Sequence, residues 1–553
     1  MSGLFRRPVK LVRSLRPNYL GLLLGVWVYF LSLTPSLLPR SVLQAAIVAG
    51  TAFALGYGIG VVASNILRWL RMPEPAQVVK KIIWWVTIPV VLGLAIYFGF
   101  KAADWQNGVR QLVGLQPLAG WDLTALFALS FVTANLWRGL ARFTSFLAHR
   151  IDHALTRLLR LPKMLLTFIS LGLAVGVMLL VFNKVVFRGF IYVSDNTYRH
   201  ANQQTDQSIV PTTSALRSGG PGSYVSWNSL GRQGRNFIGS GPTVQQLGQF
   251  NGQPATNPIR VYIGVDAAKT TEQRAQLAVQ ELERTGAFSR QVLVIMNTTG
   301  SGWIEEPAAD ALEYMYNGNS ASVSVQYSFL PSWITQISSQ SSSTETGQAI
   351  YDAVYAAWSK LPANSRPKLL SYGLSLGSYS GQSPFKDASD MATKIDGAVF
   401  AGSPNFSQPW HDITLHRDPS SPEYKPVYQA GSVVKFANTN QDIMADGPTH
   451  ILYLQHPSDP VVWWSSDLIF HKPDWLAETR GYDVSPSFHW YPFISFLQVG
   501  VDQFFATKAP VGHGHNYANS YAYAWAAVAQ PEGWSQAQTA RLQQLLNSGI
   551  YLN

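Results

Sequence analysis

Cysteine is absent from the 553 residues of this chain. Its absence excludes disulfide bonds, thiolate metal ligands and a cysteine nucleophile together. The chain also has no His-Glu-x-x-His motif, and no Gly-Lys-Ser/Thr follows the glycine-rich stretch around Gly220. We therefore expect neither a metal nor another cofactor.

Acidic residues are scarce in the first third of the chain. Up to Phe187 there are 19 Lys and Arg but only 4 Asp and Glu, whereas the remainder has 22 basic and 27 acidic residues. The formal net charge of +10 therefore comes from the first part, and the second part has no cluster of Lys and Arg. We expect no nucleic-acid partner, because such a partner requires a basic surface on the folded domain.

Charged residues are also nearly missing from five apolar blocks within residues 1–187. Most of these blocks run for about 20 residues, the length that crosses roughly 30 Å of hydrocarbon. The fourth block is short and begins beside Asp122, so it could instead lie in the membrane interface. Residues 1–187 are thus predicted to form a transmembrane domain of about five helices: Tyr19–Leu38, Val42–Ile66, Ile82–Phe100, Trp121–Trp137 and Met164–Phe187.

The basic residues between these blocks predict an orientation, because Lys and Arg accumulate on the cytoplasmic side of a membrane. The N-terminal segment and the second and fourth connections carry 15 of them, and the first and third connections carry 3. We expect a multi-pass protein of the cytoplasmic membrane, with a cytoplasmic N-terminus and everything after Phe187 outside the cytoplasm. The 15 are Arg6, Arg7, Lys10, Arg13, Arg16, Arg68, Arg71, Lys80, Lys81, Arg138, Arg142, Arg150, Arg157, Arg160 and Lys163, and the 3 are Arg40, Lys101 and Arg110.

Residues 188–257 are polar and rich in Gly, Ser, Asn and Gln. Breakers such as Ser218-Gly-Gly-Pro-Gly222 are typical of a flexible linker. Trp227 and Phe237, with arginines between them, are unusual in a simple tether. The segment is predicted to be either a linker or a cap over the domain that follows.

Residues 258–553 alternate between short β-branched runs and longer amphipathic ones, of which Thr271–Thr285 is the clearest helix. Strands that alternate with helices indicate βαβ units and a mainly parallel sheet with helices on both faces. The predicted fold class is therefore an α-helical transmembrane domain followed by an α/β domain of the hydrolase type. Its predicted strands are Arg260–Gly264, Val292–Met296, Val323–Tyr327, Leu369–Tyr372, Ala398–Ala401, Val433–Ala437 and Ile451–Leu454.

A Gly-x-Ser-x-Gly motif, Gly373-Leu374-Ser375-Leu376-Gly377, follows one of these strands directly. At such a position a sharp strand-to-helix turn lifts the serine hydroxyl above the edge of the sheet. The glycines are needed because side chains at their positions would clash. Ser375 is the predicted nucleophile.

A nucleophilic serine needs a base and a carboxylate, which in this fold follow it in the order Ser, acid, His. Asp459 comes just after the strand Ile451–Leu454 and is the predicted acid, although a turn Asp before Pro460 would satisfy the same residues. His513 and His515, before a last helix, compete for the role of base, and the start of that helix favours His515. The same histidines with Asp459 could instead ligate a metal, an alternative that no metal motif supports.

The oxyanion of the tetrahedral intermediate needs two backbone N–H donors. Leu376, the residue after the nucleophile, is the first. The loop after the strand Val292–Met296 offers Thr299 or Gly300 as the second, although a plain glycine turn would read the same way.

Several segments together resemble a family of bacterial membrane α/β-hydrolases that is common in actinobacteria. They include YGLSLGSYSG, HPSDPVVWW, VGHGHNY and the stretch GAFSRQVLVIMNTTGSGW, and the apolar first part is similar too. The resemblance covers nearly the whole chain. It implies a triad of Ser375, Asp459 and a histidine, and it leaves the substrate open.

These expectations combine into a membrane-anchored serine esterase or lipase acting on membrane lipids or lipid-linked envelope components. A transacylase that moves an acyl chain onto another lipid or a glycan is one alternative, and a catalytically silent sensor or scaffold is another. The expected partners are the bilayer and a lipid substrate, and the oligomeric state cannot be predicted. Tryptophans of the second half are compatible with an acyl groove, an interfacial surface or ordinary core packing: Trp303, Trp410, Trp463, Trp464, Trp475 and Trp490.

Overall fold

The computed structural model describes residues 18–72 and 76–549, so the five predicted cytoplasmic residues Arg6, Arg7, Lys10, Arg13 and Arg16 lie outside the described part. The chain divides into two units, each interrupted in sequence. Two segments of the second half therefore belong to the same unit as the apolar helices. Unit 1 is Met1–Val186, Ser466–Pro473 and Val484–Asp502, and unit 2 is Phe187–Ser465, Asp474–Asp483 and Gln503–Asn553.

Unit 2 is built on a seven-stranded sheet in which every neighbouring pair of strands is parallel. The order is β1-β3-β2-β4-β5-β7-β6, so β4 lies at the centre. The carboxyl ends of parallel strands meet at one edge of a sheet, where sites form in open α/β folds. The strands are β1 (Ile259–Ile263), β2 (Val292–Asn297), β3 (Ser320–Val325), β4 (Lys368–Leu374), β5 (Gly397–Ala401), β6 (Val434–Ala437) and β7 (Ile451–Leu454).

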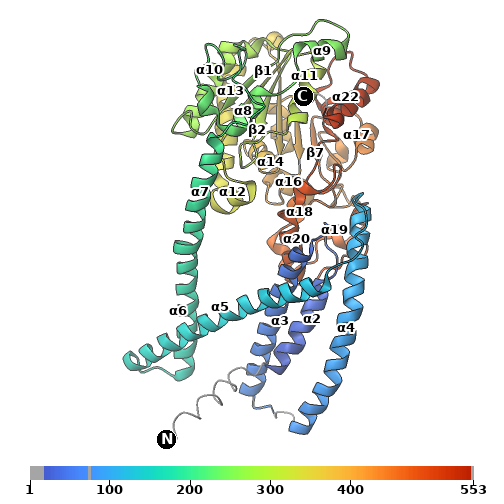
Figure 1. Ribbon diagram of the computed structural model, residues 1–553. Coiled ribbons are helices and arrows are strands. Elements are labelled where there is room, and N and C mark those ends of the chain that lie inside the picture. The colour runs from blue at the N-terminus through green and yellow to red at the C-terminus, as the bar shows by residue number, and fades with distance from the viewer. Residues whose placement is uncertain (1–17, 73–75, 550–553) are drawn as a thin grey trace. The chain divides into compact units, whose positions relative to one another are not determined.

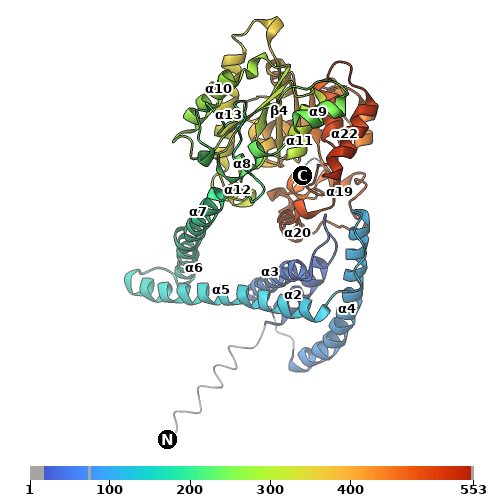
Figure 2. The same ribbon diagram turned by 45° about the horizontal axis from the view of Figure 1, so that its top comes forward.

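Helices cover both faces of this sheet (Figures 1 and 2). On one face α10 (Thr271–Thr285) and α13 (Gln340–Trp358) pack together, and α14 (Leu376–Gln382) packs against α13. On the other, α21 (Tyr521–Ala529) contacts α11 (Glu306–Met315) and α22 (Gln536–Ser548). The predicted α/β-hydrolase fold is confirmed. Shorter helices of the second half are α12 (Ser332–Ser338), α15 (Ala388–Lys394), α16 (Gln408–Leu415), α17 (Asn440–Asp446), α18 (Pro460–Trp463), α19 (Asp474–Ala477) and α20 (Ile494–Gln503), with 3-10 turns at Ala287–Ser289, Ala363–Ser365, Gln429–Gly431, Ser466–Ile469 and Ala506–Lys508.

The seven predicted strands are the seven strands of the sheet, but β3 begins three residues earlier than predicted. Its sequence Ser-Ala-Ser-Val-Ser-Val alternates serine with apolar residues, and serine is not a typical strand residue. Two of the hydroxyls have backbone acceptors on neighbouring strands: Ser322 donates to the carbonyl oxygen of Ile259 (3.3 Å) and Ser324 to that of Met296 (2.7 Å). These bonds make a serine-rich strand stable at a buried position.

Residues 188–257, predicted as a linker or a cap, are folded along much of their length. They contain α7 (Arg188–Gln203), a 3-10 turn (Trp227–Leu230), α8 (Gly231–Gly239) and α9 (Val244–Asn251). Helix α8 packs beside the edge strand β1, and the buried Arg235 donates to the carbonyl oxygens of Asn202 (2.8 Å) and Gln204 (2.7 Å). The segment therefore packs along the edge of the sheet. A role as a cap over the active site stays a prediction.

Unit 1 contains the apolar helices. Four helices of the described chain are long and apolar enough to cross a membrane: Val42–Trp69, Lys81–Leu112, Leu123–Leu158 and Lys163–Gln203. Each overlaps one of the predicted spans, and the last passes without a break from α6 through a π-helical turn into α7. This length and composition suggest a membrane protein. The helices are α2 (Tyr19–Ser32), α3 (Val42–Trp69), α4 (Gln77–Leu112), α5 (Leu123–Leu158) and α6 (Lys163–Val181), followed by the π turn Phe182–Phe187.

The first predicted span, Tyr19–Leu38, is wrong in its second half. Helix α2 ends at Ser32, and its 14 residues make it about 21 Å long, which is shorter than the hydrocarbon core. Pro35 and Pro39 cannot continue a helix, because proline lacks the N–H that the helix needs. The residues after Ser32 form a mostly buried loop that leads to Arg40.

This loop is held by α20, which comes from far along the chain. The carboxylate of Asp502 accepts from the backbone N–H groups of Leu37 (3.1 Å) and Leu38 (3.3 Å). The side-chain amide of Gln498 donates to the carbonyl oxygens of Ser32 (3.1 Å) and Thr34 (2.9 Å). Buried backbone groups outside a helix need such partners, so α20 completes the fold of unit 1.

Helices α2 and α3 approach each other closely through two glycine pairs spaced four residues apart. A Cβ added at Gly60 would lie 2.6 Å from the Cα of Gly21, and one added at Gly56 would lie 2.6 Å from a backbone oxygen of α2. Gly25 is similarly close to Phe53. Small residues at this spacing are typical of helix pairs within membranes.

Candidate active site

Ser375 lies at a sharp turn between β4 and α14. Its φ of 58° and ψ of −126° are strained for a residue with a side chain. A Cβ on Gly373 would lie 2.3 Å from the carbonyl oxygen of Gly377, and a Cβ on Gly377 would lie 2.3 Å from that of Asn297. Both glycines are therefore required by close backbone contacts. The turn has the form of a nucleophile elbow and leaves Ser375 half-buried at the carboxyl edge of the sheet.

Asp459 follows β7 and its buried carboxylate accepts three hydrogen bonds. Oδ1 accepts from the N–H of Val461 (2.9 Å), and Oδ2 accepts from Nδ1 of His515 (2.7 Å) and from the hydroxyl of Tyr517 (2.7 Å). A hydrogen on Nδ1 leaves Nε2 as the acceptor, which is the tautomer that a general base needs. No motif in the sequence assigns a role to Tyr517, although it follows His515 by two residues.

Gly402 lies against the ring of His515, and the residue before it binds the backbone of Ser375. The N–H of Ser375 donates to the carbonyl oxygen of Ala401 at the end of β5 (3.0 Å), and Gly402 is the next residue. Gly402 has a φ of 53°, and a Cβ there would lie 2.4 Å from Cε1 of His515. The imidazole thus lies against the strand end that binds the backbone of Ser375. Within the described part of the chain, Nε2 of His515 is buried and has no hydrogen-bond partner.

The predicted oxyanion donors differ in their present partners. Leu376 is the first residue of α14, where an N–H has no partner within the helix. The N–H of Thr299 donates to the carbonyl oxygen of Trp303 (3.0 Å), and that of Gly300 donates to the hydroxyl of Ser332 (3.2 Å). A serine hydroxyl can rotate away, whereas the bond of Thr299 closes a backbone turn. Gly300 fits the role better, and all three donors stay predictions.

His513, the competing base, binds a second buried carboxylate. Its Nδ1 donates to Oδ2 of Asp483 (2.9 Å), which also accepts from the hydroxyl of Ser458 (2.5 Å). The Ser458 oxygen in turn accepts from the N–H of Gly514 (2.9 Å). The two histidines therefore donate to different carboxylates, His513 to Asp483 and His515 to Asp459. Asp483 lies in an irregular stretch without a motif, so no sequence signal points to it.

Glu305 is a buried acid whose electrostatic neighbours include His515. Burial raises its pKa to about 7, although a hydrogen bond from Tyr521 and the charge that His515 carries when protonated act in the opposite direction. The Tyr521 hydroxyl in turn accepts from the hydroxyl of Tyr372 (2.9 Å), which lies on β4 three residues before Ser375. A group that ionises near neutral pH therefore lies close to the candidate base. No motif in the sequence marks Glu305.

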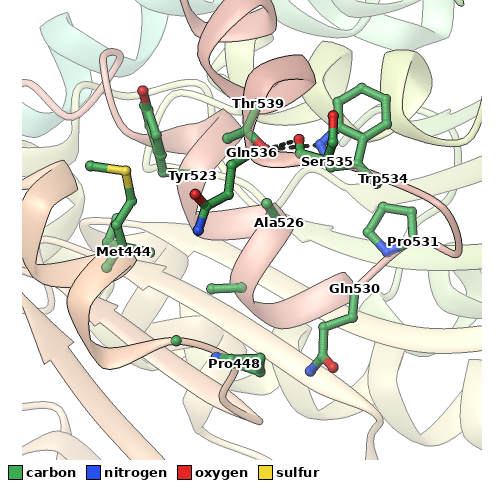
Figure 3. A pocket seen from close by; sticks show the side chains of 13 residues that line it. Met444, Pro448, Tyr523, Ala526, Gln530, Pro531, Trp534, Ser535, Gln536 and Thr539 are labelled. Atoms are coloured by element: carbon green, nitrogen blue, oxygen red, sulfur yellow. Dashed lines mark hydrogen bonds between the residues drawn. The ribbon is translucent and has the colours of Figure 1, made fainter.

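A cleft of about 270 Å³ lies at the other edge of the sheet. Figure 3 shows its lining, with Tyr523 from α21, Gln530 and Trp534 from the segment between α21 and α22, and Pro448. Pro448 precedes β7, and Lys368 at the start of β4 donates to a carbonyl oxygen at the end of α21. The cleft therefore lies at the amino ends of the strands, away from Ser375. Among the described residues, no group of three or more His, Asp or Glu side chains is placed to hold a metal ion.

Comparison with known proteins gives two matches to family models. Residues 259–542 match the model described as an alpha/beta-hydrolase family, and residues 33–242 match the model of the N-terminus of an alpha/beta-hydrolase family. No curated protein and no solved structure matches the chain. The two models together cover both the apolar helices and the sheet that carries Ser375.

Proposed function

Because the chain belongs to this alpha/beta-hydrolase family, we propose that it is a membrane-anchored serine hydrolase that cleaves lipid esters through an acyl-serine intermediate. One observation carries the proposal: the buried Nε2 of His515 has no partner among the described residues, and its ring lies against Gly402, next to the carbonyl that binds Ser375. A buried acceptor without a donor is costly. The hydroxyl of Ser375 would supply that donor.

The chemistry follows from these contacts. Oγ of Ser375 bonds to the ester carbonyl carbon while its proton passes to Nε2 of His515, and Asp459 stabilises the imidazolium through Nδ1. The N–H groups of Leu376 and Gly300 bind the oxyanion. The bond to the alcohol oxygen then breaks and His515 returns the proton to it. Water attacks the acyl-enzyme in the same way, which releases the acid and restores Ser375.

The site of action follows from the membrane helices. Among the predicted spans, the second and fourth connections contain four and six basic residues and the third contains two, so the second and fourth favour the cytoplasmic side. Unit 2 then lies outside the cytoplasm, where lipids and lipid-linked envelope esters are found. This inference does not depend on α2, because the sides of the membrane are assigned by starting at the last spanning helix, Lys163–Gln203, and working back along the chain.

The proposal is tested by labelling the purified full chain in detergent with a fluorophosphonate probe, which reacts only with activated serines. Ser375→Ala should abolish labelling, and Ser341→Ala, a change at an exposed serine on α13, should leave it intact. Labelling that survives in Ser375→Ala would refute Ser375 as the nucleophile. A folded wild type that is not labelled even with lipid present would point to a silent sensor or scaffold.

A further inference from the structure

Three aromatic rings from distant segments of unit 2 lie together: Phe190, Trp333 and Phe504. The ring centroid of Trp333 on α12 is 5.9 Å from that of Phe190 on α7 and 5.5 Å from that of Phe504. All three rings are more than a third exposed to solvent. An exposed group of large apolar rings is a sign of an interaction surface.

The position of Phe190 fixes the depth of this group in a membrane. It belongs to the apolar helix Lys163–Gln203, whose apolar run ends at Phe187. Phe190 is three residues later, about 5 Å along the helix. Arg188 and Tyr192 flank it, and basic and aromatic residues of this kind mark the level of the lipid head groups.

The chain before α12 runs along α7 toward that level. Arg199 lies over the ring of Phe329, 4.8 Å from its centroid, and four residues later Trp333 contacts Phe190. Residues 190 and 199 are about 14 Å apart along the helix. Helix α12 therefore descends beside α7, as Figures 1 and 2 both show.

The same segment contacts the predicted oxyanion loop. Ser332, next to Trp333, accepts the N–H of Gly300, and a Cβ on Gly300 would lie 2.6 Å from the Cα of Ser332. Ser332, which binds the loop that would hold the ester oxygen, is thus the sequence neighbour of Trp333, whose side chain is at head-group level. An ester carbonyl of a bilayer lipid lies at a similar depth.

Four apolar side chains form the exposed part of this surface, and we call them the rim: Trp333, Ile337, Phe504 and Phe505. Ile337 is 56% exposed and lies one turn after Trp333, so both are on the same side of α12. Lys508 lies over the ring of Phe505 (5.6 Å) and can reach a phosphate. The core tryptophans Trp410 and Trp463 are, by contrast, buried.

We propose that the rim lies in the head-group layer of the outer leaflet and that the site takes esters of bilayer-resident lipids directly from it. The substrate class, which rests on the proposed serine hydrolysis, is a lipid ester whose carbonyl reaches Ser375 while its acyl chains remain in the bilayer. Burial of the rim in lipid stabilises this docking, and Lys508 favours anionic head groups.

The docking is tested without any catalysis, because the chain has no cysteine and accepts single labels. Ile337→Cys and Phe504→Cys, labelled with an environment-sensitive nitrobenzoxadiazole dye, are placed in nanodiscs of phosphatidylcholine and phosphatidylglycerol. Brominated lipids should quench both dyes, and they should not quench the dye at Leu415→Cys, an exposed position on α16. Dyes shielded without lipid quenching would show that a protein covers the rim and would overturn the proposal, as would fully hydrated dyes.

The substrate class is tested in the same nanodiscs. Trp333→Ala with Phe504→Ala should lower hydrolysis of an embedded fluorogenic phospholipid by roughly tenfold or more, since two large rings lose their burial. Hydrolysis of soluble 4-nitrophenyl butyrate and fluorophosphonate labelling should stay at the level of Leu415→Ala. Equal loss on both substrates would overturn direct lipid uptake, whereas absent labelling in wild type would instead refute the serine hydrolase itself.

Discussion

His515 and His513 are two residues apart, and each donates its Nδ1 to a buried aspartate, yet their surroundings differ. The side chain of His515 is 4% exposed and that of His513 is 20% exposed. Tyr517 and Val461 complete the bonds of Asp459. At the second pair the remaining oxygen, Oδ1 of Asp483, has no hydrogen-bond partner within the described chain.

An aspartate partner therefore does not by itself identify a histidine as a general base. Both histidines have one, and both occur in the same short motif. The two histidines differ at Nε2. In His515 this nitrogen is buried, and the ring lies beside the end of β5, which binds the backbone of Ser375. The second pair instead links Ser458 to the N–H of Gly514, the residues that precede Asp459 and His515. We infer that the second pair positions the loops of the first.

The largest effect should come from the matched histidine substitutions. His515→Asn removes the proton acceptor and should lower kcat on a soluble ester by on the order of 10⁵-fold. His513→Asn should lower it by less than about tenfold, because the positioning loop keeps its other contacts. Ester hydrolysis by both variants, with thermal unfolding as a check on folding, makes the comparison. The reverse order of effects would exchange the roles of the two histidines.

The aspartate substitutions should have the next largest effects. Asp459→Asn should lower kcat by on the order of 10⁴-fold, because the amide no longer holds the correct imidazole tautomer. Asp483→Asn should act mainly on folding, lowering the free energy of unfolding by about 1 to 3 kcal/mol as a buried acceptor loses its charge. Kinetics and denaturant unfolding of both variants measure the two effects. A loss of kcat in Asp483→Asn as large as in Asp459→Asn would contradict a positioning role.

The smallest expected effect is a change of stability with pH that is caused by Glu305, an electrostatic neighbour of His515. Its folded-state pKa of about 7 exceeds the ordinary value of 4.5, so the folded chain binds more protons between these pH values. Stability therefore falls as pH rises from about 4.5 to about 7, by up to about 3 kcal/mol. Glu305→Gln should remove this fall, and the exposed Glu345→Gln should keep it. Unfolding midpoints at pH 5 and pH 8 provide the measurement, and an unchanged slope would disprove it.

The fold could be predicted from the sequence because parallel strands are buried on both faces and appear as short apolar runs. Only β3 was misplaced, since its serine hydroxyls have partners on strands that are distant in sequence. The end of α2 was also misplaced, because an apolar loop that packs against α20 has the same composition as a membrane helix.

The candidate site could be predicted only where a motif adjoins a strand, as at Ser375 and Asp459. The choice between the histidines, and the presence of Asp483 and Glu305, depends on contacts between residues far apart in sequence. The positions of the tryptophans also depend on contacts that the sequence does not reveal. The tryptophans of the second half were compatible with a lipid surface or with core packing, and Trp410 is buried whereas Trp303 is exposed. The exposed Trp333, next to the residue that binds the N–H of Gly300, was not among those considered.

The membership of Val484–Asp502 in unit 1 has a consequence for biosynthesis. These residues lie between Asp459 and His515 in the sequence, so the ribosome makes the candidate acid first, then a segment that belongs with the apolar helices, and then the candidate base. The apolar helices are made first and must await this piece, which Asp502 and Gln498 bind to the loop after α2. Unit 1 is therefore complete only after most of the chain that forms the sheet of unit 2 has been translated.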